Sequence, residues 1–286
     1  GRNREGLAAL DAAWPDVEEL GNPTLLSGWL LWRSFALLGA GELLEARRLA
    51  ELAARGGGVA SPAHQSQQFF CLAMPALLLG WDDPLLDEAE PRFRASLRDG
   101  EGLATTSYAF LELERLAVVG AHEQVRSLVA VLAALPSAGL PMFSFVVLAA
   151  ELQAAFALGD DAEVDRLLPL ARDAALASQG PFQEAVEATN RSLVLAGRGE
   201  PMAAEAAAHE GLALGEHGLD GYLSEPIEAL AVALAAGDDL AGAARVAGIG
   251  AGWRDRIGLV ARPDARARPL AAALAATGRA ADVAAI

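Results

Sequence analysis

Glycine recurs at nearly equal intervals along this chain, each time at the end of an apolar run. Each one is followed by one to four small or polar residues and then by a second run rich in alanine and leucine. Glycine suits the left-handed residue that closes a helix, and acidic residues suit the first turn of the next helix. The pattern therefore predicts helical hairpins of roughly 40 residues, repeated six to seven times. The separations range from 38 to 41 residues between Gly39, Gly80, Gly120, Gly159, Gly197, Gly237 and Gly278.

Signals for β-strands are nearly missing. The best candidate, Phe143–Ala150, continues without a break into another apolar run, which favours a helix. Because one helical hairpin cannot bury its apolar face alone, we predict an all-α fold. The architecture expected is an α-solenoid, a right-handed superhelix of about six to seven tetratricopeptide-like hairpins. We expect a single domain over 1–286, with a partial repeat at 1–20 and a C-terminal cap at 253–286.

Composition narrows the classes of partner. The net charge of −16 disfavours direct binding of nucleic acid or of anionic lipid by this segment. No apolar run reaches the ~18 residues that a membrane span needs, so no membrane association is expected. The one cysteine, Cys71, lies in an apolar run and is predicted to be a buried core residue, as suits a cytoplasmic protein. Neither end resembles a natural terminus, so we expect a piece of a longer bacterial protein.

Two stripes run along the first helix of each predicted hairpin. Positions ten, seven and three residues before the turn glycine are apolar in five of six hairpins, for example Phe70, Ala73 and Leu77, and are predicted to form the core. The fifth hairpin departs from this pattern with Glu187 and Asn190.

The second stripe, twelve, eight and five residues before the glycine, mixes polar, charged and aromatic residues. In helical-hairpin solenoids the first helices line the concave surface, and a ligand groove needs such a mixture. The same stripe can instead be plain solvated surface, and the sequence leaves both interpretations open. The candidate ligand-binding residues on or beside this stripe are Gln67, Gln68, Tyr108, Glu112, Arg115, Glu151, Gln153, Thr189 and Arg191.

Catalytic and cofactor motifs were sought along the chain. The four histidines have no metal-ligand spacing, and the paired aspartates at the turns, such as Asp160 and Asp161, fit helix capping better than calcium binding. The glycines within Ala247–Asp255 follow no strand, and a Walker loop needs a lysine, which this chain lacks. We expect no metal, no cofactor and no enzymatic activity in this segment.

The hairpins resemble tetratricopeptide-like repeats, whose turn reads Gly-Asp/Asn-x-x-x-Ala. The period near 40 is more similar to the repeat region of large ATP-dependent bacterial regulators of the LuxR/MalT type and of related cyclase–ATPase proteins. The tail matches the outline of that region's end, although glycines at 248, 250 and 252 replace its usual helix formers. The matching positions are Arg254, Arg256, Gly258, Pro263, Arg266 and Arg268. The resemblance implies the sensor and interaction arm of a transcriptional regulator.

Three functions remain open from the sequence. The first is a regulatory module that senses a small-molecule inducer or a peptide in the concave groove. The second is a scaffold that holds protein partners and has no small-molecule ligand. The third, an all-α enzyme, has the least support, because no nucleophile–base pair or metal set is found.

Overall fold

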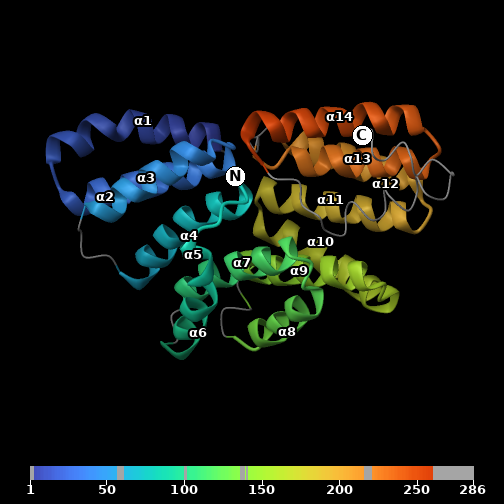
Figure 1. Ribbon diagram of the computed structural model, residues 1–286, viewed down its shortest axis with the longest axis horizontal. Coiled ribbons are helices and arrows are strands. Elements are labelled where there is room, and N and C mark those ends of the chain that lie inside the picture. The colour runs from blue at the N-terminus through green and yellow to red at the C-terminus, as the bar shows by residue number, and fades with distance from the viewer. Residues whose placement is uncertain are drawn as a thin grey trace. The chain divides into compact units, whose positions relative to one another are not determined.

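Helices make up all of the regular secondary structure in residues 3–56, 61–99, 102–135, 139, 141–215 and 221–259, the part of the chain that the computed structural model describes (Figure 1). The predicted all-α class is confirmed for these residues. The helices are α1 (Asn3–Leu20), α2 (Pro23–Gly39), α3 (Leu43–Arg55), α4 (Pro62–Leu78), α5 (Pro84–Asp87), α6 (Ala89–Asp99), α7 (Gly102–Val118), α8 (His122–Ala133), α9 (Pro141–Leu158), α10 (Asp161–Ser178), α11 (Pro181–Gly197), α12 (Pro201–Leu214), α13 (Ser224–Ala236) and α14 (Leu240–Ile257).

Local chemistry accounts for where the helices begin. Pro62 and Pro181 stand at the first residue of α4 and α11, where a missing N–H costs nothing. One aspartate of each turn pair accepts a hydrogen bond from a backbone N–H in the first turn of the next helix, as predicted. These bonds are 2.9 Å from Leu85 to Asp83, 3.3 Å from Glu163 to Asp160 and 2.8 Å from Gly242 to Asp239.

One turn geometry closes six helices: α2, α4, α7, α9, α11 and α13. In each turn a residue with positive φ donates its N–H to the carbonyl three residues back, and the next residue donates to the carbonyl five residues before it. This is the Schellman arrangement, which satisfies the last carbonyls of a helix. The residues with positive φ are 39 or 40 positions apart: Gly41, Gly80, Gly120, Gly159, Gly199 and Asp238.

The predicted left-handed glycine is wrong in three of these turns. Gly39 and Gly197 are the last residues of α2 and α11, and Gly237 has a φ of −89°. The helices run further than expected, so the left-handed conformation falls on Gly41, Gly199 and Asp238. Gly278 and the tail positions from Pro263 onward lie outside the described residues.

Contacts divide the described residues into two compact units. The first holds α1 to α6 and α7 up to Arg115, together with Gly221 and residues 257–259; the second holds residues 116–215 and 222–256. The units are described separately here, and a single domain over 1–286 stays a prediction.

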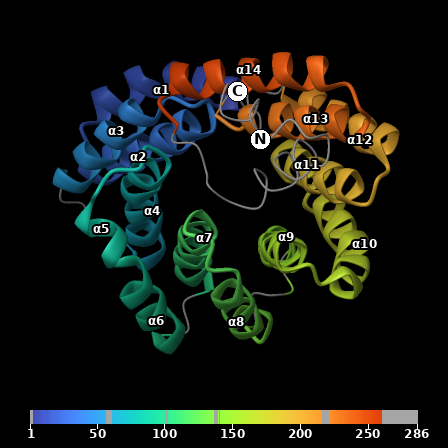
Figure 2. The same cartoon turned by 45° about the vertical axis from the view of Figure 1, so that its right-hand side comes forward.

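Within each unit, consecutive helices pack on one another. In the first unit α2 packs on α3 and on α4, as Figure 2 shows, and α1 packs on α2. In the second unit α9 packs on α10 and α11, and α11 packs on α12 and α13. Helices α2, α9 and α11 thus each contact both the partner across the Schellman turn and the next helix of their own kind.

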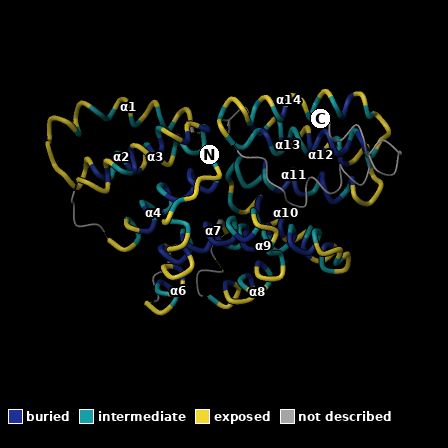
Figure 3. The backbone as a smooth tube through the Cα atoms, in the orientation of Figure 1, coloured by how far each residue is buried: buried dark blue, intermediate teal, exposed yellow. Residues whose placement is uncertain are grey.

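Burial of the two predicted stripes differs from expectation. The apolar stripe is buried or half-buried except at Trp32, whose exposed fraction is 53%. Figure 3 shows how buried and exposed residues alternate along the helices. The mixed stripe is buried at most of its positions, and two of its serines bind the second helix of their hairpin. The Ser34 hydroxyl donates to the Ala46 carbonyl at 2.6 Å, and the Ser27 hydroxyl donates to the Ala53 carbonyl at 3.2 Å.

Candidate functional site

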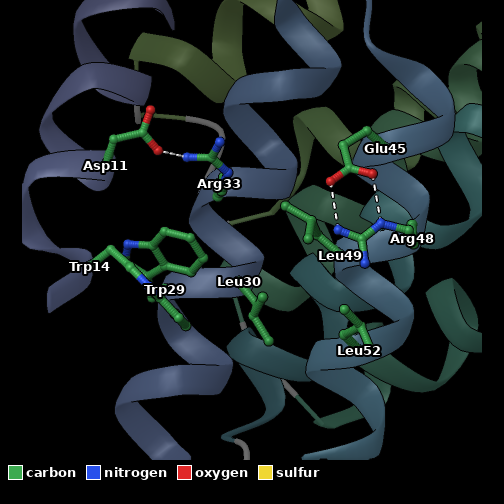
Figure 4. A pocket seen from close by; sticks show the side chains of 9 residues that line it. All are labelled: Asp11, Trp14, Trp29, Leu30, Arg33, Glu45, Arg48, Leu49 and Leu52. Atoms are coloured by element: carbon green, nitrogen blue, oxygen red, sulfur yellow. Dashed lines mark hydrogen bonds and ion pairs between the residues drawn. The ribbon is translucent and has the colours of Figure 1, made fainter. Parts of the chain in front are cut away.

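Helices α1, α2 and α3 line a shallow cavity of about 420 Å³ that is open to solvent in the first unit (Figure 4). Its apolar lining comes from two tryptophans and three leucines, and its polar lining from two arginines and two carboxylates. The charges alternate between acidic and basic and sum to zero. The lining residues are Asp11, Trp14, Trp29, Leu30, Arg33, Glu45, Arg48, Leu49 and Leu52.

Two tryptophans form the aromatic wall of this cavity. The ring centroids of Trp14 and Trp29 are 4.5 Å apart, and the Trp29 Nε1 donates to the Leu10 carbonyl at 2.8 Å. The hydrogen bond fixes the Trp29 ring, and the guanidinium of Arg33 lies over its face at 5.3 Å from the centroid. The wall is therefore held in place by α1 and α2 together.

The charged groups of the cavity occur as two ion pairs. Arg33 pairs with Asp11 across α1 and α2, and Arg48 donates two hydrogen bonds of 2.6 Å to Glu45 within α3. The hydrogen bond with Arg48 lowers the pKa of Glu45, and the positive charges of Arg48 and Arg33 lower it further. The electrostatic contact between Arg33 and Glu45 links the two pairs.

Sequence reasoning missed this cavity. Trp29 was predicted as core, and the Glu45–Arg48 pair matches ordinary helix-surface spacing. The other lining residues lie on α1, α2 and α3, and no local sequence pattern shows that these helices contact one another. The concentration of tryptophan at positions 14, 29 and 32 was the one available signal.

A second surface in the first unit is a row of four aromatic side chains on α2, α4 and α7. We call it the aromatic row: Trp32, Phe35, Phe70 and Phe110. Successive ring centroids are 6.3, 6.1 and 5.5 Å apart. Trp32 and Phe35 have exposed fractions of 53% and 49%, and Phe70 and Phe110 are half-buried. Exposed contiguous aromatic surface of this kind marks binding sites more often than isolated exposed residues do.

Five of the predicted ligand-binding residues lie in the first unit. Gln67 and Gln68 are half-buried on α4, Gln67 one helical turn from Phe70 of the aromatic row. Tyr108 is buried against Phe69, with ring centroids 5.5 Å apart. Arg115 donates two hydrogen bonds of 2.8 Å to Glu112, whose side chain is 5% exposed.

The other four lie in the second unit, and each contacts a protein group. The Gln153 amide donates to Asn190 Oδ1 at 2.9 Å, and the Thr189 hydroxyl donates to the Ala185 carbonyl. Arg191 binds Glu187 and Glu210, and Glu151 lies 3.6 Å from Arg166. Since Tyr108, Glu112 and Thr189 are buried, these three offer little surface to a ligand, and ligand contact by the nine residues stays a prediction.

Glu187 and Asn190, the departure in the fifth hairpin, are both buried. Arg191 donates to the two carboxylate oxygens of Glu187 at 2.9 and 3.2 Å and to Glu210 of α12 at 2.7 Å. Burial lowers the pKa of Arg191, but the hydrogen bonds to the two carboxylates outweigh it, so the net shift is upward. This part of α11 is a buried polar cluster in a place where other first helices carry apolar side chains.

Glu151 provides a pH-dependent test of the second unit. Burial raises the pKa of Glu151 above its ordinary value of 4.5, against the opposing charge of Arg166. A raised pKa means that the folded state binds the proton more tightly, so the contribution of Glu151 to stability is lost as the pH rises from 4.5 through the folded pKa. The permanently neutral variant Glu151→Gln should therefore become more stable relative to the parent protein as the pH rises from 4 to 8.

Urea unfolding at several pH values measures this difference, and Glu163→Gln is the control. The hydrogen bond with Arg166 lowers the pKa of Glu163, so its contribution to stability is present above pH 4.5 and is lost on acidification. Glu163→Gln should become less stable relative to the parent protein as the pH rises from 4 to 8. If the stabilities of both variants, relative to the parent, changed in the same direction with pH, the opposite pKa shifts assigned to Glu151 and Glu163 would be contradicted.

Metal and nucleophile chemistry find little support in the described residues. Their His, Cys, Asp and Glu side chains form no group of three that could hold a metal ion. Cys71 is buried, as predicted, and burial raises the pKa of its thiol to about 12, which keeps it protonated at neutral pH. The glycines at 248, 250 and 252 lie inside α14 and form no phosphate-binding loop. None of the described helices has the length and hydropathy of a membrane span.

Comparisons of the sequence and the structure with known proteins find no matching family model, no matching curated protein and no matching solved structure.

Proposed function

We propose that this chain is a non-catalytic binding module in which helical hairpins stack as a tetratricopeptide-like α-solenoid, a right-handed superhelix with a period near 40 residues. The observation that carries the proposal is the recurrence of one Schellman turn at intervals of 39 or 40 residues in six places. The packing of first helices on one another, as α9 on α11 and α11 on α13, also supports it. Solenoids of this kind present long surfaces for recognition.

The module would serve as the sensor and protein-interaction arm of a bacterial transcriptional regulator similar to the LuxR/MalT type, with a cytoplasmic location. The aromatic row supports binding by the first helices, because it offers exposed apolar area beside the polar Gln67. A bound inducer or partner can shift the equilibrium between two conformations of a regulator only if it binds one conformation more tightly than the other. The second candidate, a scaffold without a small-molecule ligand, is favoured because the aromatic row extends across three helices.

A thermal-shift screen of metabolites tests the sensing role. A ligand that stabilises the parent chain should shift the melting temperature of Trp32→Ala/Phe35→Ala by less than half as much, because binding energy adds to the stability of the folded state. Leu44→Ala is the matched control, since Leu44 is 65% exposed on α3 and lies outside the aromatic row. Equal shifts in all three proteins would place the ligand elsewhere and contradict the proposed surface.

A partner protein separates the two candidates. If the ATPase domain that the proposed regulator would carry binds the parent chain and loses affinity in the Trp32→Ala/Phe35→Ala variant while no metabolite shifts the melting temperature, the scaffold function is supported. Sequence beyond either end that encodes neither an ATPase nor a DNA-reading domain would contradict the regulator assignment.

A further inference from the structure

We propose that the cavity between α1, α2 and α3 binds a small zwitterion of dipeptide size that carries an aromatic side chain. This inference is independent of the aromatic row, which is made of other side chains. It follows from three properties of the cavity: its size, the composition of its walls and the alternation of charge around it.

The size and walls fit a small organic molecule with an apolar body. The volume of about 420 Å³ falls in the range of small-molecule sites and leaves room for a dipeptide. The Trp14 and Trp29 rings meet at 45°, and Leu30, Leu49 and Leu52 complete the apolar lining. A tilted aromatic pair of this kind offers edge and face contacts to a third ring.

The charges select against a ligand with one sign of charge. Two cations and two anions line the cavity. A ligand with only a carboxylate or only an ammonium is therefore repelled by a group of its own charge beside each group that attracts it. A zwitterion can place its ammonium on a carboxylate and its carboxylate on a guanidinium at the same time. Arginine binds carboxylates through two parallel hydrogen bonds, as Arg48 already does with Glu45.

The existing ion pairs leave these groups available. The side chains of Asp11 and Arg33 are 57% and 25% exposed, and those of Glu45 and Arg48 are 44% and 56% exposed. Exposed ion pairs contribute little net stability, so a ligand can exchange partners with them at small cost. The rigid part of the cavity is the Trp29 ring, which the hydrogen bond to the Leu10 carbonyl holds in place.

Isothermal titration calorimetry with four matched probes tests the proposal on the 286-residue chain. The probes are Gly-Phe, N-acetyl-Gly-Phe, Gly-Phe amide and N-acetyl-Gly-Phe amide, which are zwitterionic, anionic, cationic and neutral. We expect saturable binding of Gly-Phe, about tenfold weaker binding of the anionic and cationic probes, and still weaker binding of the neutral probe, because a hydrogen bond between charged groups is worth roughly a factor of ten or more. Equal affinity for the neutral probe, or no saturable binding of Gly-Phe, would overturn the proposal.

Paired variants assign the binding to this cavity. Asp11→Asn/Glu45→Gln removes both anionic groups and should weaken Gly-Phe about tenfold while binding N-acetyl-Gly-Phe at least as well as the parent does. Arg33→Gln/Arg48→Gln should weaken Gly-Phe to a similar extent and leave Gly-Phe amide unaffected. Glu88→Gln/Glu90→Gln removes two carboxylates in the same way at the start of α6, outside the cavity, and should bind all four probes like the parent.

Thermal melting of each variant shows whether it is folded. The exposed pairs contribute little to stability, so the melting temperatures should stay close to that of the parent. A loss of Gly-Phe binding in the α6 variant as large as in the cavity variants would show that net charge, and not this site, governs binding.

Discussion

Arg191→Leu is expected to lower the free energy of unfolding by about 3 kcal/mol, because it leaves the buried carboxylate of Glu187 without a partner. The Glu187 side chain is 5% exposed, and Arg191 satisfies both of its oxygens while it also reaches Glu210 of α12. Breaking a buried pair costs more than the pair contributes, since the remaining charge stays desolvated. Urea unfolding followed by circular dichroism measures the change.

Two further variants separate burial from charge removal. Arg94→Leu removes an arginine from an i, i+4 pair with Glu90 on α6, where both side chains are largely exposed, and should cost about 0.3–0.5 kcal/mol. The double variant Glu187→Gln/Arg191→Leu should recover most of the loss, because the ionised group has been removed. If Arg191→Leu costs no more than Arg94→Leu, the polar cluster of α11 is not a structural element.

The turns and helix starts could be predicted because their chemistry is local. A Schellman turn depends on about six consecutive residues, and a cap depends on four, so glycine, proline and aspartate placed them within a residue or two. The errors at Gly39 and Gly197 have a local cause as well. Each stands two residues before another glycine, and the sequence does not show which of the two takes the left-handed conformation.

Which helix faces are buried was harder to predict, because small polar residues can be buried as well as exposed. Ser34 is fully buried since its hydroxyl reaches the Ala46 carbonyl, a contact that depends on how closely α2 and α3 approach. A polar residue at such a position looks like surface in the sequence. Trp32 is the opposite case, because a residue expected in the core is half exposed.

The cavity could not be predicted from periodicity at all. Asp11, Arg33 and Glu45 belong to three helices, and each has ordinary surface spacing within its own helix. Only the packing of α1 on α2 and of α2 on α3 brings them around the same space. The buried pair of Glu187 and Arg191 lies between these cases, since its departure from the apolar stripe was visible but its burial was not.

Leu167→Ala is expected to have the second large effect, a loss of about 3 kcal/mol, because it leaves a void in the core of the second unit. Leu167 is fully buried on α10, in a cluster that includes Leu152 of α9 and Val194 of α11. Leu170→Ala is the matched control on the same helix. Since Leu170 is 41% exposed, its truncation should cost less than about 1 kcal/mol.

The distribution of the Leu167→Ala effect also tests the proposed solenoid. In a stack of hairpins, stability is a sum of terms within each hairpin and between neighbours, so a defect should be felt mainly where it occurs. Native-state hydrogen exchange should accelerate in α9, α10 and α11, while the amides of α2 and α3 exchange at the rates of the parent protein. Uniform acceleration along the whole chain would indicate a single cooperative core and would contradict a repeat architecture, because only a globular domain couples its distant helices so completely.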